Sequence, residues 1–127
     1  MSSSKDKKKP PSRQQRVGRR YEDQAAAFYQ RQGFAIVARN WRSGHKEIDL
    51  IVRRAELLVF VEVKASMSQE FGHPAARIDA TKMKNLSSAA QAYMVEEGID
   101  TCDCRFDVVT FFEGRLEHYP DAFPFTD

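Results

Sequence analysis

Three charged side chains stand at positions where the interior of a sheet would otherwise be apolar. Glu62 and Lys64 interrupt the hydrophobic segment FVEVKA at residues 60–65, and Asp49 lies between two aliphatic residues. Because alternate residues of a strand face the same side of a sheet, Glu62 and Lys64 should share one face. Charges at buried positions are costly unless they are paired or hold an ion. These three residues are therefore the first candidates for chemistry.

The turn between the two predicted strands decides whether the acids Asp49 and Glu62 meet. With a two-residue loop at residues 55–56, Asp49 lies opposite Glu62, and Glu47 lies opposite Lys64, all on one face. A three-residue loop would separate the two acids. The loop residues Ala-Glu are a poor sequence for the tightest turns, so the two-residue register is an interpretation that a bulge would change.

Two carboxylates that face each other repel unless a proton or a cation lies between them. Hard divalent cations, Mg²⁺ or alternatively Mn²⁺, prefer oxygen ligands of this kind, and the main-chain carbonyl of Val63 with waters would complete the shell. Lys64 would orient an attacking water or stabilise negative charge on a phosphate. The alternative interpretation is an ordinary charge pair between Glu62 and Lys64 on a solvated sheet face.

Glu22 is a fourth acid that a helix would bring to this place. Apolar residues recur at helical spacing over residues 17–32, and Gly33 is suited to end the helix. Glu22 lies at the edge of the apolar stripe, one turn from Gly18 and one turn from Ala26. These small residues would let the helix approach the sheet closely. The alternative is a solvated helix glutamate.

The remaining elements follow from periodicity and turn residues. Strands are predicted over residues 34–41, 47–52, 57–65, 104–112 and 116–120, and a second helix begins after Asp79 and ends near Gly98. The order is α-β-β-β-α-β-β. The first three strands should form an antiparallel meander, and the helical crossover should place the fourth strand parallel to the third. The sequence thus predicts a mixed α/β sheet flanked by helices.

Charge is distributed unevenly along the 127-residue chain. Residues 1–20 carry a net charge of +7 and the remaining residues −5, which together give the overall +2. We predict a disordered basic arm at residues 1–15 and one folded domain at residues 16–127. Nucleic acid is the expected partner, with Arg19, Arg20 and Lys82 as contacts. The alternative for the arm is a solubilising tail.

The sequence offers no feature of a membrane or secreted protein. No apolar stretch approaches the roughly 20 residues that span a bilayer, and no apolar run follows the N-terminal lysines. We therefore expect a cytoplasmic protein without membrane contact. Its oligomeric state is left open by the sequence.

The segments EIDLIV and LLVFVEVK resemble the active-site hairpin of the restriction-endonuclease-like superfamily, the PD-(D/E)-x-K nucleases. More narrowly, residues 16–123 resemble the YraN-like family (UPF0102), small bacterial proteins regarded as endonuclease candidates related to archaeal Holliday-junction resolvases. The segments that carry this resemblance are GRRYEDQAA, RNWR, EIDLI, FVEVKA, FGHP, RFDVV and DAF. The resemblance implies an α/β fold with a restriction-endonuclease-like core of order α-β-β-β-α-β(-β).

The same resemblance implies roles for the charged residues. Asp49 and Glu62 would be metal ligands, Lys64 the catalytic lysine, and Glu22 the helix-borne acid shared with the resolvases. The implied activity is an endonuclease dependent on Mg²⁺ or Mn²⁺ that acts on DNA, with branched and single-stranded DNA among the candidate substrates. The alternatives are a nucleic-acid-binding accessory protein that does not cut, and a partner-binding module that uses the C-terminal AFPF segment.

Three positions depart from the family pattern. Lys46 and Tyr21 stand where the family usually has glycine, and Ser66 stands where it usually has arginine. The metal-binding residues are untouched by these changes. The missing arginine removes an expected phosphate contact.

Overall fold

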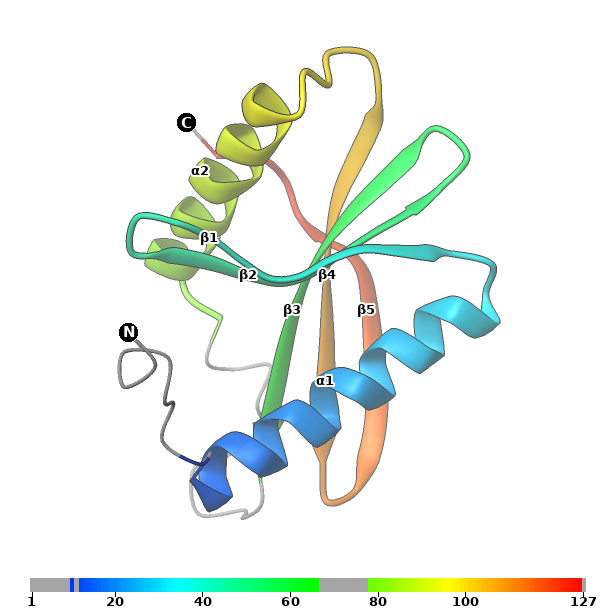
Figure 1. The fold of residues 1–127 in the computed structure, drawn as a ribbon, viewed down its shortest axis with the longest axis vertical. Coiled ribbons are helices and arrows are strands. Elements are labelled where there is room, and N and C mark those ends of the chain that lie inside the picture. Colours follow the sequence, from blue (N-terminus) through cyan, green and yellow to red (C-terminus); the bar gives the residue numbers. More distant parts are fainter. Residues whose placement is uncertain (1–9, 11, 67–77, 127) are drawn as a thin grey trace, which may run out of the picture.

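The computed structural model describes residues 10, 12–66 and 78–126, and the arrangement of their elements is the predicted one (Figure 1). Five strands form one mixed sheet, and two helices flank it. The elements are α1 (Arg13–Arg31), β1 (Ala35–Ser43), β2 (Lys46–Arg54), β3 (Leu57–Ser66), α2 (Ala80–Glu96), β4 (Asp103–Phe112) and β5 (Arg115–Phe123).

Helix α1 begins earlier than the sequence pattern indicated. Its N-cap Ser12 accepts a hydrogen bond from the backbone N–H of Gln15, and the Gln15 side chain accepts one from the Ser12 backbone. This reciprocal capping box stabilises the first turn. The helix therefore extends three residues into the segment predicted as a disordered arm. Residues 1–9 and 11 lie outside the described residues. Gly33, with φ of +87°, follows the end of the helix as expected.

The strand order across the sheet is β1-β2-β3-β4-β5. The first three strands form the predicted antiparallel meander, and β4 pairs parallel to β3 as expected for a helical crossover. Strand β5 is longer than predicted and reaches Phe123. Its register against β4 shifts near Asp121, where φ is +51°, so a bulge carries the strand past Pro120.

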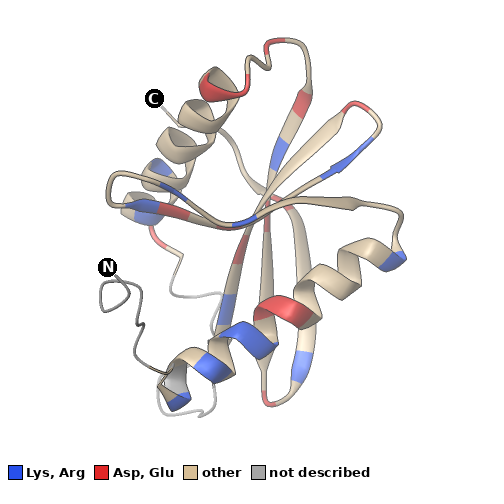
Figure 2. Ribbon diagram, in the orientation of Figure 1, with Lys and Arg blue, Asp and Glu red and all other residues tan. Residues whose placement is uncertain are grey.

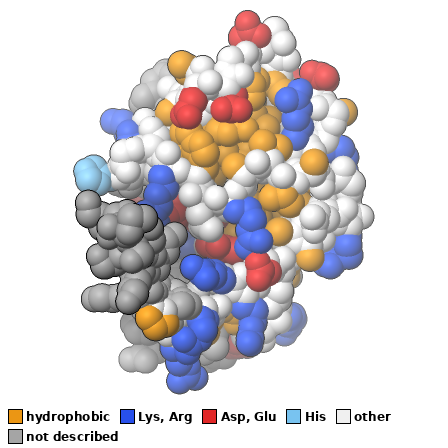
Figure 3. Space-filling model, viewed as in Figure 1, with side chains coloured by type: hydrophobic (Ala, Val, Ile, Leu, Met, Phe, Trp, Pro, Cys, Tyr) orange, Lys and Arg blue, Asp and Glu red, His pale blue; other side chains and the backbone are white. Residues whose placement is uncertain are grey.

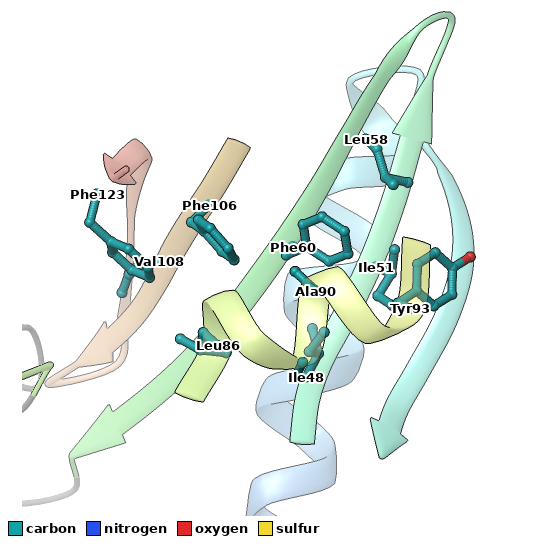
Figure 4. Close-up of a cluster of buried hydrophobic side chains, with 11 residues drawn as sticks. Ile48, Ile51, Leu58, Phe60, Leu86, Ala90, Tyr93, Phe106, Val108 and Phe123 are labelled. Carbon is teal, nitrogen blue, oxygen red and sulfur yellow. The ribbon is translucent and has the colours of Figure 1, made fainter. Parts of the chain in front are cut away.

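The two helices cover opposite faces of the sheet, and each covers its own apolar cluster. Figure 4 shows α2 in front of the sheet and α1 behind it. The α2 cluster lies between α2 and the sheet. The α2 cluster is centred on Phe60, Phe106 and Tyr93, and the α1 cluster on Tyr29 and the valines of β3. The central strands carry apolar residues on both faces because a helix covers each face of the sheet. Neither helix is long and apolar enough to cross a membrane, as far as the described residues extend.

The C-terminal AFPF segment packs against the sheet. The Phe123 ring stacks on Phe106 with 4.8 Å between centroids, and the Phe125 ring lies 4.5 Å from the same residue. The backbone N–H of Thr126 donates to Ser87 Oγ on α2. Both phenylalanines thus contribute to the α2 cluster, although Phe125 keeps 36% of its surface exposed.

Candidate active site

A fork between β2 and β3 forms the centre of the candidate site. The two strands pair from Arg54–Leu57 to Leu50–Val61, which is the register of the predicted two-residue turn. Ala55 adopts φ of +53° in that turn. Beyond Leu50 the strands separate, and Figure 1 shows the β1–β2 hairpin and the end of β3 pointing in different directions. Beyond this point the two strands no longer pair with each other.

The side chain of Asp49 takes the place of strand pairing at the fork. Asp49 Oδ2 accepts a hydrogen bond of 2.8 Å from the backbone N–H of Val63. The ladder consequently ends before Glu47 can lie opposite Lys64, and that predicted pair does not form. Glu47 instead contacts Arg42 across the β1–β2 hairpin, with Oε2 3.1 Å from Nε.

The carboxyl groups of Asp49 and Glu62 lie close enough to interact directly. Burial, the hydrogen bond with Glu62 and the negative charge of Glu62, in that order, raise the pKa of Asp49 to about 9. The negative charge of Glu22 also raises it, and the Val63 N–H partly offsets these effects. Asp49 is therefore protonated at neutral pH, beside a Glu62 side chain that is only 3% exposed.

Two ammonium groups approach Glu62 Oε2 from different elements. Lys82 Nζ on α2 lies 2.8 Å away and Lys64 Nζ on β3 lies 3.7 Å away. Burial lowers the pKa of Lys82, but contact with Glu62 and the charges of Asp49 and Glu47 outweigh it, and the pKa is raised. The Lys82 contact lacks the orientation of a hydrogen bond, so the buried Oε2 atom makes an ion pair only.

A polar hollow of about 370 Å³ lies on the α1 side of the site. Glu22 Oε1 accepts a hydrogen bond of 3.2 Å from Asn40 Nδ2 within it. Arg20 is exposed on the same helix but does not line it. The polar hollow is lined by Gln15, Gly18, Arg19, Glu22, Asn40, Arg42 and Glu47.

Basic side chains concentrate near the polar hollow, in the first turns of α1 (Figure 2). Figure 2 shows Lys and Arg in the first turns of α1 and acidic residues further along the helix. Figure 3 shows basic groups gathered in the lower part of this face, with acidic groups among them and an apolar patch above. The arrangement is suited to an anionic ligand that approaches from the N-terminal end of α1.

The structure thus brings Asp49, Glu62, Lys64 and Lys82 into one cluster, with Glu22 near enough for its charge to act on Asp49. Lys82, predicted as a nucleic-acid contact, is part of this cluster through Glu62. Within the described ranges, no three Asp, Glu, His or Cys side chains are grouped closely enough to hold a metal ion without other ligands.

Sequence reasoning gave no role to Asn40 and Arg42, which line the polar hollow. Both belong to RNWR, a segment noted only for its family resemblance.

Two of the residues that depart from the family pattern make defined contacts in the structure. Lys46 Nζ donates a 2.7 Å hydrogen bond to Ser88 Oγ and so ties the β1–β2 hairpin to α2. The Tyr21 ring packs 4.7 Å from Phe111. The Ser66 backbone pairs with Phe112, and its side chain lies outside what is described.

A second buried acid, Asp107 in RFDVV, lies on the α1 face of the sheet. It accepts hydrogen bonds from Tyr29 Oη at 2.7 Å, His118 Nε2 at 2.8 Å, Arg105 Nε at 2.8 Å and the Asp121 backbone N–H at 3.0 Å. Burial alone would raise the pKa of Asp107, but these donors hold it below its usual value. The carboxylate links α1, β4 and β5.

Comparison with known proteins places the chain among bacterial relatives. The model of the uncharacterised protein family UPF0102 matches residues 21–111. A UPF0102 protein of Chlorobium chlorochromatii is 40% identical over 124 residues, covering 90% of this chain and 95% of the relative. A UPF0102 protein of Dechloromonas aromatica is 43% identical over 110 residues, covering 87% and 90%. One of Desulforapulum autotrophicum is 41% identical over 116 residues, covering 88% and 96%.

Proposed function

This chain belongs to the uncharacterised protein family UPF0102, and from its site we propose that it is an endonuclease that hydrolyses phosphodiester bonds in DNA with the help of Mg²⁺ or Mn²⁺. The observation that carries the proposal is the pair of neighbouring carboxyl groups at the fork, Asp49 and Glu62, with two lysines beside them. A buried acid pair is costly for stability, so its presence at the end of the strand pairing indicates a functional purpose.

The residues at the fork fit a hard divalent cation. Asp49 and Glu62 supply the oxygen ligands, and a proton together with the Lys82 ammonium balances their charge in the arrangement described above. Both of these positive groups can be replaced by one ion of charge +2. When bound there, the ion would act as a Lewis acid on a phosphoryl oxygen.

The chain's own residues would bind and orient the DNA. Hydrolysis joins a water oxygen to phosphorus, breaks the bond to the leaving sugar oxygen and transfers a proton to that oxygen. Lys64, 28% exposed and beside Glu62, places a positive charge where negative charge develops on the phosphate. Glu22 accepts a hydrogen bond from the attacking water. Arg19 and Arg42 attract the phosphates that flank the reacting one.

The polar hollow, which lies beside the fork on the α1 side, would hold the DNA next to the reacting phosphate. Its volume of about 370 Å³ accommodates a sugar-phosphate unit and is too small for a duplex. A strand that leaves the duplex at a branch or an end would fit it better than continuous double helix. Branched and single-stranded DNA are therefore the favoured substrates.

A cleavage panel tests the proposal. Linear duplex, branched and single-stranded DNA would each be incubated with the protein and Mg²⁺ or Mn²⁺, and with a chelator in parallel. We expect metal-dependent cleavage of the branched or single-stranded DNA, and none by the Asp49→Ala variant. Cleavage that persists in the chelator or in the variant would point to a contaminating nuclease. Binding without cleavage of any substrate would overturn the proposed activity.

A non-catalytic DNA-binding accessory protein is the second candidate. The 2.8 Å ion pair between Lys82 and Glu62 favours it, because a lysine held on a ligand oxygen opposes metal binding. So does the absence, among the described residues, of a third metal-binding side chain at the cluster. The cleavage panel separates the two candidates.

Lys64 gives a sharper test of the mechanism. The substitution Lys64→Met keeps the aliphatic part of the side chain and removes its charge. Because that charge is expected to act mainly in the transition state, cleavage should fall by about 10²–10³-fold. DNA affinity should change by less than about three-fold, since uniform binding is not lost. Metal affinity should not fall, because the lost ammonium group lies beside a proposed ligand of the ion. Single-turnover cleavage, Mn²⁺ titration and DNA-binding assays measure the three quantities. Lys84→Met, at an exposed position of α2, is the matched control. Cleavage at the wild-type rate would remove Lys64 from the mechanism.

A further inference from the structure

Lys82 occupies a position in α2 that the helix itself does not favour. It lies in the first turn, where its backbone N–H donates a 2.9 Å hydrogen bond to Oδ1 of the N-cap Asp79. The first turn of a helix carries partial positive charge, so a cation there is unfavourable. The N-cap Asp79 offsets part of this, and the first turn itself contains no acidic residue. The contact with Glu62 is what makes the position favourable.

The cap and the ion pair together fix where the lysine charge lies. Asp79 sets the start of the helix, and this places the Lys82 side chain over Glu62. Nζ lies 2.8 Å from Glu62 Oε2, closer than the 3.7 Å of Lys64 Nζ. The Lys82 side chain is 38% exposed, so it has room to move toward solvent while Glu62 stays buried. Of the two lysines, Lys82 is therefore the one that can exchange with another cation.

We propose that Lys82 is a resident counter-ion of the carboxyl pair, which competes with the divalent cation for Glu62 and so sets the metal affinity of the site. This inference rests on the proposed function, since it assumes a divalent cation at the fork. The lysine neutralises Glu62 and must leave when the ion arrives. Removing it should strengthen metal binding, whereas removing a ligand or an ordinary structural ion pair should weaken it.

The sign of the expected effect follows from charge. Lys82 Nζ lies 2.8 Å from Glu62 Oε2, so its positive charge repels a divalent cation that approaches the same oxygen. Without Lys82 this repulsion is lost and Glu62 loses its nearest positive partner, so metal binding is strengthened.

Direct titration of the metal-free protein with Mn²⁺, without DNA, tests the proposal. We expect Lys82→Met to bind Mn²⁺ about 10-fold or more tightly than wild type. Lys82→Arg, which keeps the charge, should bind within about three-fold of wild type. Lys84→Met, two residues further along α2 and exposed, should be indistinguishable from wild type. Circular dichroism at the titration temperature identifies any variant that does not fold.

The outcomes separate this inference from the proposed function. If wild type and Lys82→Met bind Mn²⁺ equally, or the variant binds more weakly, the counter-ion role is wrong while the metal site stands. If neither binds Mn²⁺, both the metal site and the counter-ion role are wrong. If only Lys82→Met binds measurably, the competition is confirmed in its strongest form. If Lys82→Met does not fold, Lys82→Gln replaces it, and an affinity at or below that of wild type overturns the proposal.

Discussion

The substitution Asp49→Asn should abolish binding of Mg²⁺ and Mn²⁺, reduce cleavage by about 10³-fold or more, and make the metal-free protein more stable. The amide is nearly isosteric with the protonated carboxyl group that Asp49 presents at neutral pH. Its oxygen can accept the Val63 N–H bond, and its NH₂ group can donate to Glu62. The geometry of the fork is then retained, but a neutral amide cannot replace an anionic ligand.

The stability gain has a defined dependence on pH. The pKa of Asp49 is raised to about 9 in the folded protein, from an ordinary value near 4. The stabilisation that comes with its proton is fully present below about pH 4, and it is lost as the pH rises toward 9. Wild type should therefore become less stable across this window. The variant should not show this component, and it should exceed wild type by about 1–3 kcal/mol at pH 8.

Urea unfolding at pH 5, 7 and 8.5 in a chelator measures this difference, and Mn²⁺ titration measures the metal site. Asp103→Asn provides a control, because Asp103 is exposed on β4 and takes no part in the site. It should leave both the pH dependence and the metal affinity near wild type. An Asp49→Asn variant that still binds Mn²⁺, or that parallels the wild-type pH curve, would show that Asp49 is not the buried, protonated ligand described here.

The β2–β3 register could be predicted because it depends on local features. Residues 53–56 form a short, mostly charged segment between two hydrophobic runs, and alternation along β3 places Glu62 and Lys64 on one face. The predicted pairing of Glu47 with Lys64 failed because the ladder ends early. Its end depends on the Asp49 side chain, which captures the Val63 N–H. Hydrophobic periodicity does not indicate where a side chain replaces a strand carbonyl as the acceptor of a backbone N–H.

The contacts of Lys82 and Asp107 were also beyond the reach of the sequence pattern. Lys82 follows Glu62 by 20 residues, and only the packing of α2 on the sheet brings them together. Asp107 lies in RFDVV, a segment that the sequence marked only by its family resemblance, and its partners include residues of α1 and β5. Periodicity indicates which face a residue occupies, but it does not tell which distant donors meet it there.

Asp107 leads to the second large effect, on folding rather than on chemistry. The substitution Asp107→Asn should lower the free energy of unfolding by about 3–5 kcal/mol at pH 7, because the donors around this buried position lose their anionic acceptor. The Asp107 side chain is fully buried, and Arg105 donates to it through both Nε and Nη2. Tyr29→Phe removes one neutral donor and should cost about 1 kcal/mol. Asp103→Asn, at an exposed position of the same strand, is the matched control and should be neutral.

The pH dependence of this effect is opposite in sign to that of Asp49. Because the folded pKa of Asp107 is lowered, its stabilisation is present above an unfolded value near 4, and it is lost as the pH falls through the folded pKa. The gap between wild type and Asp107→Asn should therefore narrow in urea unfolding at pH 3. Equal stability of the two proteins at pH 7 would show that the cluster does not hold α1 and β5 to the sheet.

The Asp107 cluster and the candidate metal site lie on opposite faces of the sheet. Asp107 lies on the α1 face, whereas Glu62 meets Lys82 on the α2 face, so the Mn²⁺ affinity of the folded Asp107→Asn variant should equal that of wild type. The acid that stabilises the fold is ionised, and the acid proposed to bind metal is protonated, because the first has donors around it and the second has another carboxyl group.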